Sequence, residues 1–132
     1  MTKADIEKNL LNNPILPIGS MAQILDVHER TLRIYDKAGI LCPQRTEKNR
    51  RSYNLADLEK AKVISFLTRN LGLNLSGVRV VLAMLEEGKI PISKQVDYIE
   101  KIAKKANFSR EEQDENIKKN GSKGRIKNSE KI

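Results

Sequence analysis

Three basic side chains recur at helical spacing in residues 28–38. Arg30, Arg33 and Lys37 are three and four residues apart, so a helix would place them on one face. An arginine can donate two parallel hydrogen bonds to the edge of a guanine base. On most helices, however, such a stripe is only a solvated charged face. The spacing alone therefore makes a nucleic-acid contact a hypothesis that needs a second observation.

The second observation is a basic segment directly after this helix. Residues 42–53 contain Pro43, a charged tip and polar flanks, a pattern typical of a short exposed hairpin. Basic side chains on such a ribbon, here called the wing, can neutralise phosphates and fix register. The alternative is that the charges only prevent pairing at a sheet edge. Together the two clusters predict contacts with double-stranded DNA by His28, Glu29, Arg30, Thr31, Arg33, Lys37, Arg45, Lys48, Asn49, Arg50, Arg51 and Tyr53.

Some side chains in this region have more than one plausible role. Tyr53 can give its hydroxyl to a phosphate, or it can be half-buried with its ring in the core. His28 can cap the helix, touch a base or titrate near neutral pH. Cys42 has no second cysteine to pair with, so we expect it to behave as a small apolar residue.

The elements that must position these residues are two short helices. Apolar residues share one face over residues 19–25, and Leu32 and Tyr35 share one over about 28–38. Gly39 follows the second helix, where a left-handed C-terminal cap is expected. Two short helices joined by a tight turn are typical of a helix-turn-helix, whose second helix reads the major groove.

Three further helices are expected downstream. Asn54 and Asn74 can cap helices that end near Asn70 and Gly88, and Pro91 suits the start of a last helix that ends near residue 107. The last helix has apolar residues at near-heptad spacing over only about two heptads, which favours a partner helix without proving one. We expect homodimerisation through Ile92, Val96, Ile99, Ile102 and Ala106.

The expected fold class is mainly α, a winged helix-turn-helix with a small β-hairpin wing and a C-terminal dimerisation helix. Residues 1–14 should form a flexible N-terminal arm with an indefinite helix, and residues 15–88 the DNA-binding domain. Residues 89–108 would be the dimerisation helix. Residues 109–132 are polar and mixed in charge, which predicts a disordered tail.

The composition narrows the class of protein. The formal net charge is +8 and the pI about 9.7, which favours phosphate backbones or anionic lipid surfaces as partners. The chain has one cysteine and one histidine, and no glycine-rich phosphate loop or cysteine–histidine metal spacing occurs. No stretch reaches the roughly 20 apolar residues that span a bilayer. We therefore expect a cytoplasmic protein that is not an enzyme, with no cofactor, metal site or membrane partner.

Six runs of sequence, in this order, resemble the MerR family of transcription regulators. They are IGSMA at 18–22, VHERTLRIYD at 27–36, GIL at 39–41, PQRT at 43–46, NRRSY at 49–53 and LGLNLSGV at 71–78. The resemblance covers roughly residues 15–86. It implies a winged helix-turn-helix, a C-terminal helix that pairs antiparallel with a second subunit, and an inverted-repeat operator.

The same resemblance implies roles for single residues. Arg33 would be the recognition-helix arginine, Arg50 or Arg51 the wing arginine, and Tyr53 the wing tyrosine that braces the wing or touches phosphate. Family members often have a tyrosine where this chain has Ile34. One phosphate contact of the family is therefore expected to be missing.

Two branches of the family are similar to this chain. VH at 27–28, TLR at 31–33 and LTR at 67–69 resemble the HspR heat-shock repressors, which implies repression of stress genes with the chaperone DnaK as a candidate co-repressor. PIG at 17–19 is similar to the nitrogen regulators of the GlnR and TnrA type. Two alternatives remain open, a sequence-blind architectural nucleic-acid binder and a module that docks an acidic protein.

Overall fold

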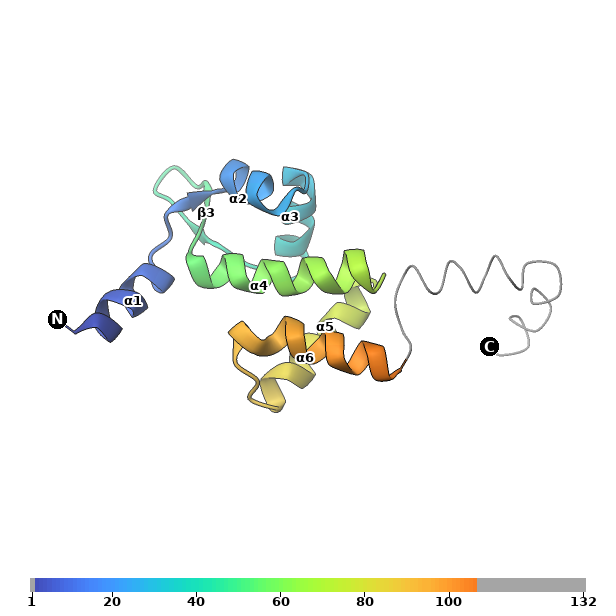
Figure 1. The fold of residues 1–132 in the computed structure, drawn as a ribbon. Helices are drawn as coiled ribbons and strands as arrows, with labels where there is room; N and C mark the ends of the chain where they lie inside the picture. Colours follow the sequence, from blue (N-terminus) through green and yellow to red (C-terminus); the bar gives the residue numbers. More distant parts are fainter. Residues whose placement is uncertain (1, 107–132) are drawn as a thin grey trace.

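The computed structural model describes residues 2–106. Its elements, shown in Figure 1, are α1 (Lys3–Asn12), β1 (Leu16–Pro17), α2 (Ile18–Leu25), α3 (Glu29–Lys37), β2 (Gln44–Arg45), β3 (Arg51–Tyr53), α4 (Leu55–Ser65), the π-helical η1 (Phe66–Asn70), α5 (Leu75–Glu87) and α6 (Ile92–Lys105). The predicted fold class, a mainly α winged helix-turn-helix, is confirmed. The predicted tail, residues 109–132, lies outside the described residues.

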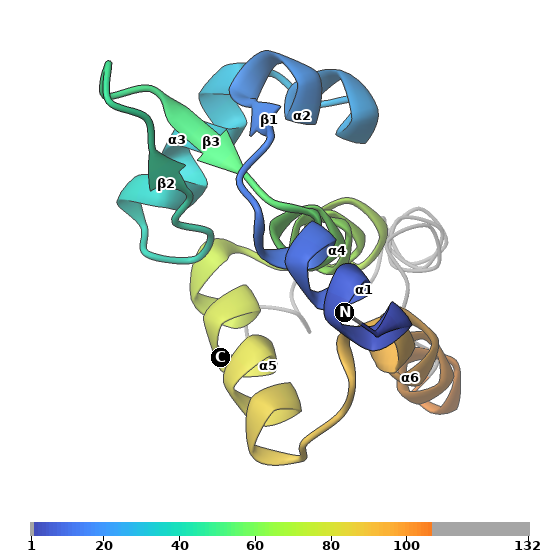
Figure 2. The ribbon, with the colours of Figure 1, turned by 90° about the vertical axis from the view of Figure 1, so that its left-hand side faces the viewer.

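The central helix, α4, lies between the helix-turn-helix and the α5–α6 pair (Figure 1). Viewed along α4 in Figure 2, α5 and α6 lie on either side beneath it. Ala61 and Val63, which point in different directions around the helix, are both about 1% exposed. A helix that is buried on several faces is typical of a core element. Because α4 contacts α2 on one side and α6 on the other, it links the two halves of the molecule.

The helix-turn-helix forms where it was expected. Met21 of α2 and Leu32 of α3 are fully buried and belong to the same hydrophobic core. The turn between the helices passes through Asp26, whose φ of 55° is left-handed, and α3 is followed by Gly39 with φ of 73°. Glycine adopts a positive φ without the steric cost that a side chain imposes, so the predicted cap at Gly39 is confirmed.

The wing is part of a three-stranded sheet rather than a hairpin alone. The strand order is β1-β3-β2 and both pairings are antiparallel, with Leu16 opposite Tyr53 and Arg45 opposite Arg51. A strand of two residues is too short to show alternation, which explains why β1 was not predicted. It anchors the base of the wing to the start of α2.

Two helix boundaries differ from the expectation. The helix expected to run to Asn70 is α-helical only to Ser65 and continues as η1, in which the Leu71 amide donates to the Phe66 carbonyl at 3.3 Å. Residues 3–12, expected as a flexible arm with an indefinite helix, form α1. Thr2 caps it reciprocally with Asp5, and a capping box satisfies two otherwise unpaired amides.

Over residues 2–106, no helix is both long and apolar enough to cross a membrane.

Candidate nucleic-acid interface

The exposed face of α3 gathers most of the predicted recognition residues. His28, Glu29, Arg30, Thr31, Arg33 and Ile34 together line one open hollow. Arg33 lies 3.6 Å from Glu29, and both side chains are about half exposed (46% and 48%). The side chains of Arg30 and Lys37 have no hydrogen-bond or ion-pair partner within residues 2–106. These cations are therefore available to an external anion.

The wing tip is a tight turn that exposes further cations. Asn49 has φ of 61°, and its amide donates to the Thr46 carbonyl at 2.8 Å. Asparagine tolerates this left-handed conformation better than most residues. Lys48 and Arg50 flank Asn49 and are exposed, and neither side chain has a partner among the residues described. The tip thus presents two unpaired positive charges.

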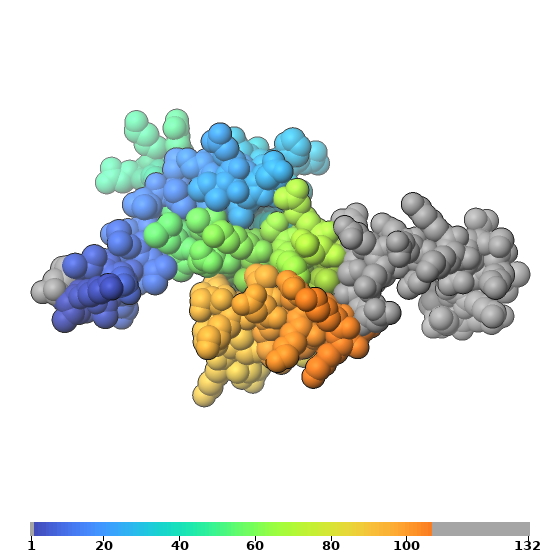
Figure 3. Space-filling model, viewed as in Figure 1, coloured from blue at the N-terminus to red at the C-terminus, as the bar shows by residue number. Residues whose placement is uncertain are grey.

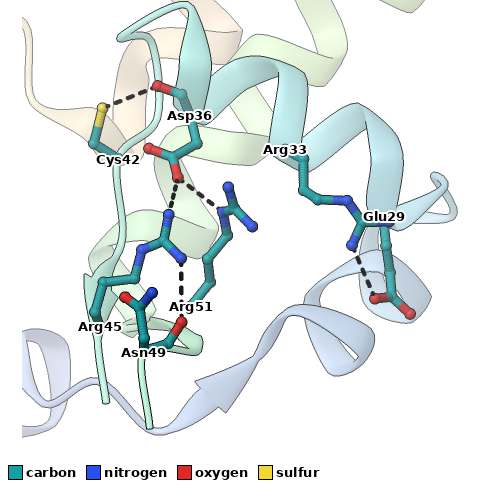
Figure 4. A network of polar contacts seen from close by, with 7 residues as sticks. All are labelled: Glu29, Arg33, Asp36, Cys42, Arg45, Asn49 and Arg51. Atoms are coloured by element: carbon teal, nitrogen blue, oxygen red, sulfur yellow. Dashed lines mark hydrogen bonds and ion pairs between the residues drawn. The ribbon is translucent and has the colours of Figure 1, made fainter. Parts of the chain in front are cut away.

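Two other wing arginines are turned toward α3, as Figure 4 shows. The Nε of Arg51 and the Nη2 of Arg45 both donate to Oδ2 of Asp36, at 2.8 and 3.2 Å. The side chain of Arg51 is only 17% exposed, whereas that of Arg45 is 43% exposed. A carboxylate that was not singled out from the sequence therefore holds both arginines, and the DNA contacts predicted for them stay predictions.

Tyr53 is not at the surface. It is fully buried, and its hydroxyl has no hydrogen-bond partner in the described chain. Burial raises the pKa of Tyr53 to about 12, because the charged phenolate would be desolvated. The predicted phosphate contact by Tyr53 is therefore corrected. The ring braces the wing against the core, which is the other role expected for it.

Two arginines from outside the helix-turn-helix hold its helix ends. Arg69 of η1 donates to the carbonyls of Leu25 and Asp26 at 3.1 and 3.2 Å, and Arg79 of α5 donates to the carbonyl of Ala38. The last carbonyls of a helix lack internal partners and carry partial negative charge. Nothing local in the sequence marks these contacts, since each joins residues more than forty positions apart.

The predicted dimerisation helix divides its apolar face between two environments. Ile99 is 7% exposed and packs, with half-buried Val96, in the core of its own chain, so its assignment to a subunit interface is corrected. Ile92 and Ile102 are 37% and 47% exposed, and Ala106 is exposed as well. An apolar hollow of about 330 Å³ lies between η1, α5 and α6 beside Ile102.

The helix-turn-helix and the wing lie on one side of α4, and α5 and α6 lie on the other (Figure 3). This arrangement defines a winged helix-turn-helix protein. The MerR HTH family regulatory protein profile matches residues 16–85. The chain belongs to the MerR family of DNA-binding transcription regulators and is not an enzyme.

Curated relatives are similar to this domain. The putative heat shock protein HspR of Streptomyces coelicolor is 32% identical over 73 residues, which are 55% of this chain and 48% of that protein. The HTH-type transcriptional regulator GlnR of Bacillus anthracis is 34% identical over 73 residues, 55% of this chain and 56% of GlnR. The chain thus spans about half the length of the curated relatives it matches.

A solved structure was also matched. It is a transcriptional regulator of the MerR family from Bacillus cereus, 27% identical, with a TM-score of 0.48 over 83% of this chain and 85% of that one.

Over residues 2–106, no group of three or more histidine, cysteine, aspartate or glutamate side chains is placed to hold a metal ion.

Proposed function

We propose that this regulator is a cytoplasmic, sequence-specific repressor that binds an inverted-repeat operator as a homodimer. The observation that carries the proposal is the pairing of an open recognition surface on α3 with an exposed basic wing tip. In this proposal, Arg30 and Arg33 reach base edges in the major groove. Lys48 and Arg50 would neutralise phosphates beside that groove.

The genes under its control are proposed to be stress genes, with a chaperone such as DnaK as co-repressor. The supporting observation is the 32% identity to HspR. The 34% identity to GlnR supports the second candidate, a regulator of nitrogen metabolism. Transcription profiles of a deletion strain, with and without heat shock or nitrogen limitation, would separate the two.

The homodimer is proposed to form through the exposed part of α6. Ile92, Ile102 and Ala106 remain accessible there, and Ile102 and Ala106 line the apolar hollow between η1, α5 and α6. A two-fold dimer would present two recognition helices, and the spacing of the half-sites would follow from its geometry. Sedimentation at micromolar concentration tests this step, since a monomer at that concentration would refute it.

Selection of bound duplexes from a random pool, at moderate salt, tests sequence-specific binding. An enriched inverted repeat is the expected result. The competing function is a sequence-blind binder, which the net charge of +8 would suffice to support. Tight binding without any enriched sequence would favour that function over the repressor.

A further inference from the structure

One carboxylate connects the recognition helix to both strands of the wing. Asp36 lies in the last turn of α3, and its Oδ2 accepts from Arg51 of β3 at 2.8 Å and from Arg45 of β2 at 3.2 Å. Arg45 and Arg51 stand opposite each other in the sheet register. Like charges directly opposite each other destabilise a strand pair, so Asp36 supplies the charge that allows the two arginines to share this position.

The contact continues from the sheet to the wing tip. Through its Nη1, Arg45 also donates to the carbonyl of Asn49 at 3.3 Å, and Asn49 is the left-handed residue of the turn. A chain of polar contacts therefore runs from α3 through Asp36 and Arg45 to the tip (Figure 4). The Asp36 and Arg51 side chains are each 17% exposed, and reduced exposure limits the screening that weakens surface ion pairs.

The direction of these contacts separates the wing cations into two groups. Arg45 and Arg51 are directed at Asp36, whereas Lys48 and Arg50 are exposed without a partner in the part of the chain that the structure describes. The first group sets where the tip lies relative to α3. The second group is free to meet phosphates.

We propose that Asp36 is a positioning residue for DNA binding. It holds the wing at a set distance from α3, so that Lys48 and Arg50 reach the backbone while α3 occupies the major groove. The inference depends on the wing contacts of the proposed function, but it does not depend on operator sequence. The opposite possibility is that Asp36 only neutralises two arginines that would otherwise bind phosphate.

The test compares Asp36→Asn with the wild type in binding to one random-sequence duplex over a series of salt concentrations. Each phosphate contact contributes about 0.9 to the slope of log affinity against log salt. In the wild type, Lys48→Ala combined with Arg50→Ala should lower this slope by about two. In Asp36→Asn the slope should already be lowered, and the double change should have little further effect.

Three controls accompany the measurement. Asp97→Asn removes the same charge from an exposed site on α6 and should leave the slope unchanged. Asp36→Glu retains the carboxylate and should restore most of the slope. Arg45→Met removes only the more exposed of the two arginines, so the Asp36–Arg51 pair is kept and the slope should be lowered in part. This variant keeps the inference testable if circular dichroism shows that Asp36→Asn does not fold.

Three results would overturn the inference. Tighter binding with a steeper slope in Asp36→Asn would show that the released arginines bind phosphate. An unchanged slope, with the full effect of the double change retained, would show that the wing tip does not need Asp36. If the double change has no effect in the wild type, the wing contacts of the proposed function fail as well, and that result is distinct from the other two.

Discussion

The guanidinium of Arg79 in α5 donates a hydrogen bond to the backbone carbonyl of Ala38, the residue that follows the recognition helix. Since α5 belongs to the half of the molecule that packs under α4, this contact joins the end of the recognition helix to that half. The end of α3 is thus held at two points, by Arg79 at the Ala38 carbonyl and by the wing arginines at Asp36.

Replacing Arg79 by methionine should destabilise the fold by about 1 kcal/mol, because the Ala38 carbonyl loses a charged donor while most of the side-chain stem is retained. Urea unfolding measures this difference. Lys101→Met, at an exposed site on α6, is the matched control and should change stability little. Equal losses in the two variants would contradict a specific role for the contact with Ala38.

Arg33 and Arg50 should have separable effects on DNA binding. Arg33→Ala should relax the preference at particular base pairs by about 1 to 3 kcal/mol, because a base-edge contact is lost. Arg50→Ala should weaken binding to all sequences alike and reduce the salt slope by about one. Competition assays with single-base operator variants make the comparison. Sequence-independent losses from both changes would argue against direct base contact by Arg33.

The buried hydroxyl of Tyr53 should make stability fall in alkaline solution. Its pKa is about 12 in the folded chain and about 10 when unfolded, so folding favours the protonated form. Its contribution is complete below pH 10 and is lost as the pH rises from 10 through 12. Between pH 9 and 11 the wild type should lose about 1 kcal/mol more than Tyr53→Phe. Parallel stability curves for the two proteins would exclude this effect.

Ile99 and Ile102, which lie one helical turn apart in α6, should play different roles. Ile99→Ala should lower the free energy of unfolding by about 2 to 4 kcal/mol, because it leaves a cavity in the core. Ile102 is 47% exposed, so Ile102→Asp should preserve the secondary structure seen by circular dichroism while shifting sedimentation toward monomer. If Ile102→Asp leaves an observed dimer intact, the subunit interface must lie elsewhere.

Local sequence was sufficient for most of the helices from α2 onward and for the face of α3, although not for α1 or the π-helical η1. Asn54 and Asn74 accept from amides three residues later, as expected of N-caps, and Gly39 provides the predicted left-handed residue. These features involve residues within one helical turn, where side-chain type and backbone preference decide the conformation. The same applies to the basic stripe on α3, because helical periodicity alone places Arg30 and Arg33 together.

Tertiary structure decided which of the candidate side chains remain free. Arg51 is held by a residue fifteen positions away, Tyr53 is buried by a sheet with an unpredicted strand, and Ile99 packs into its own core. The sequence around a side chain is the same whether that side chain contacts solvent, DNA or a distant part of the chain, so local sequence does not reveal the partner. The sequence determined most of the helices and the family, and only the packing of distant elements determined that Asp36 lies between the recognition helix and the wing.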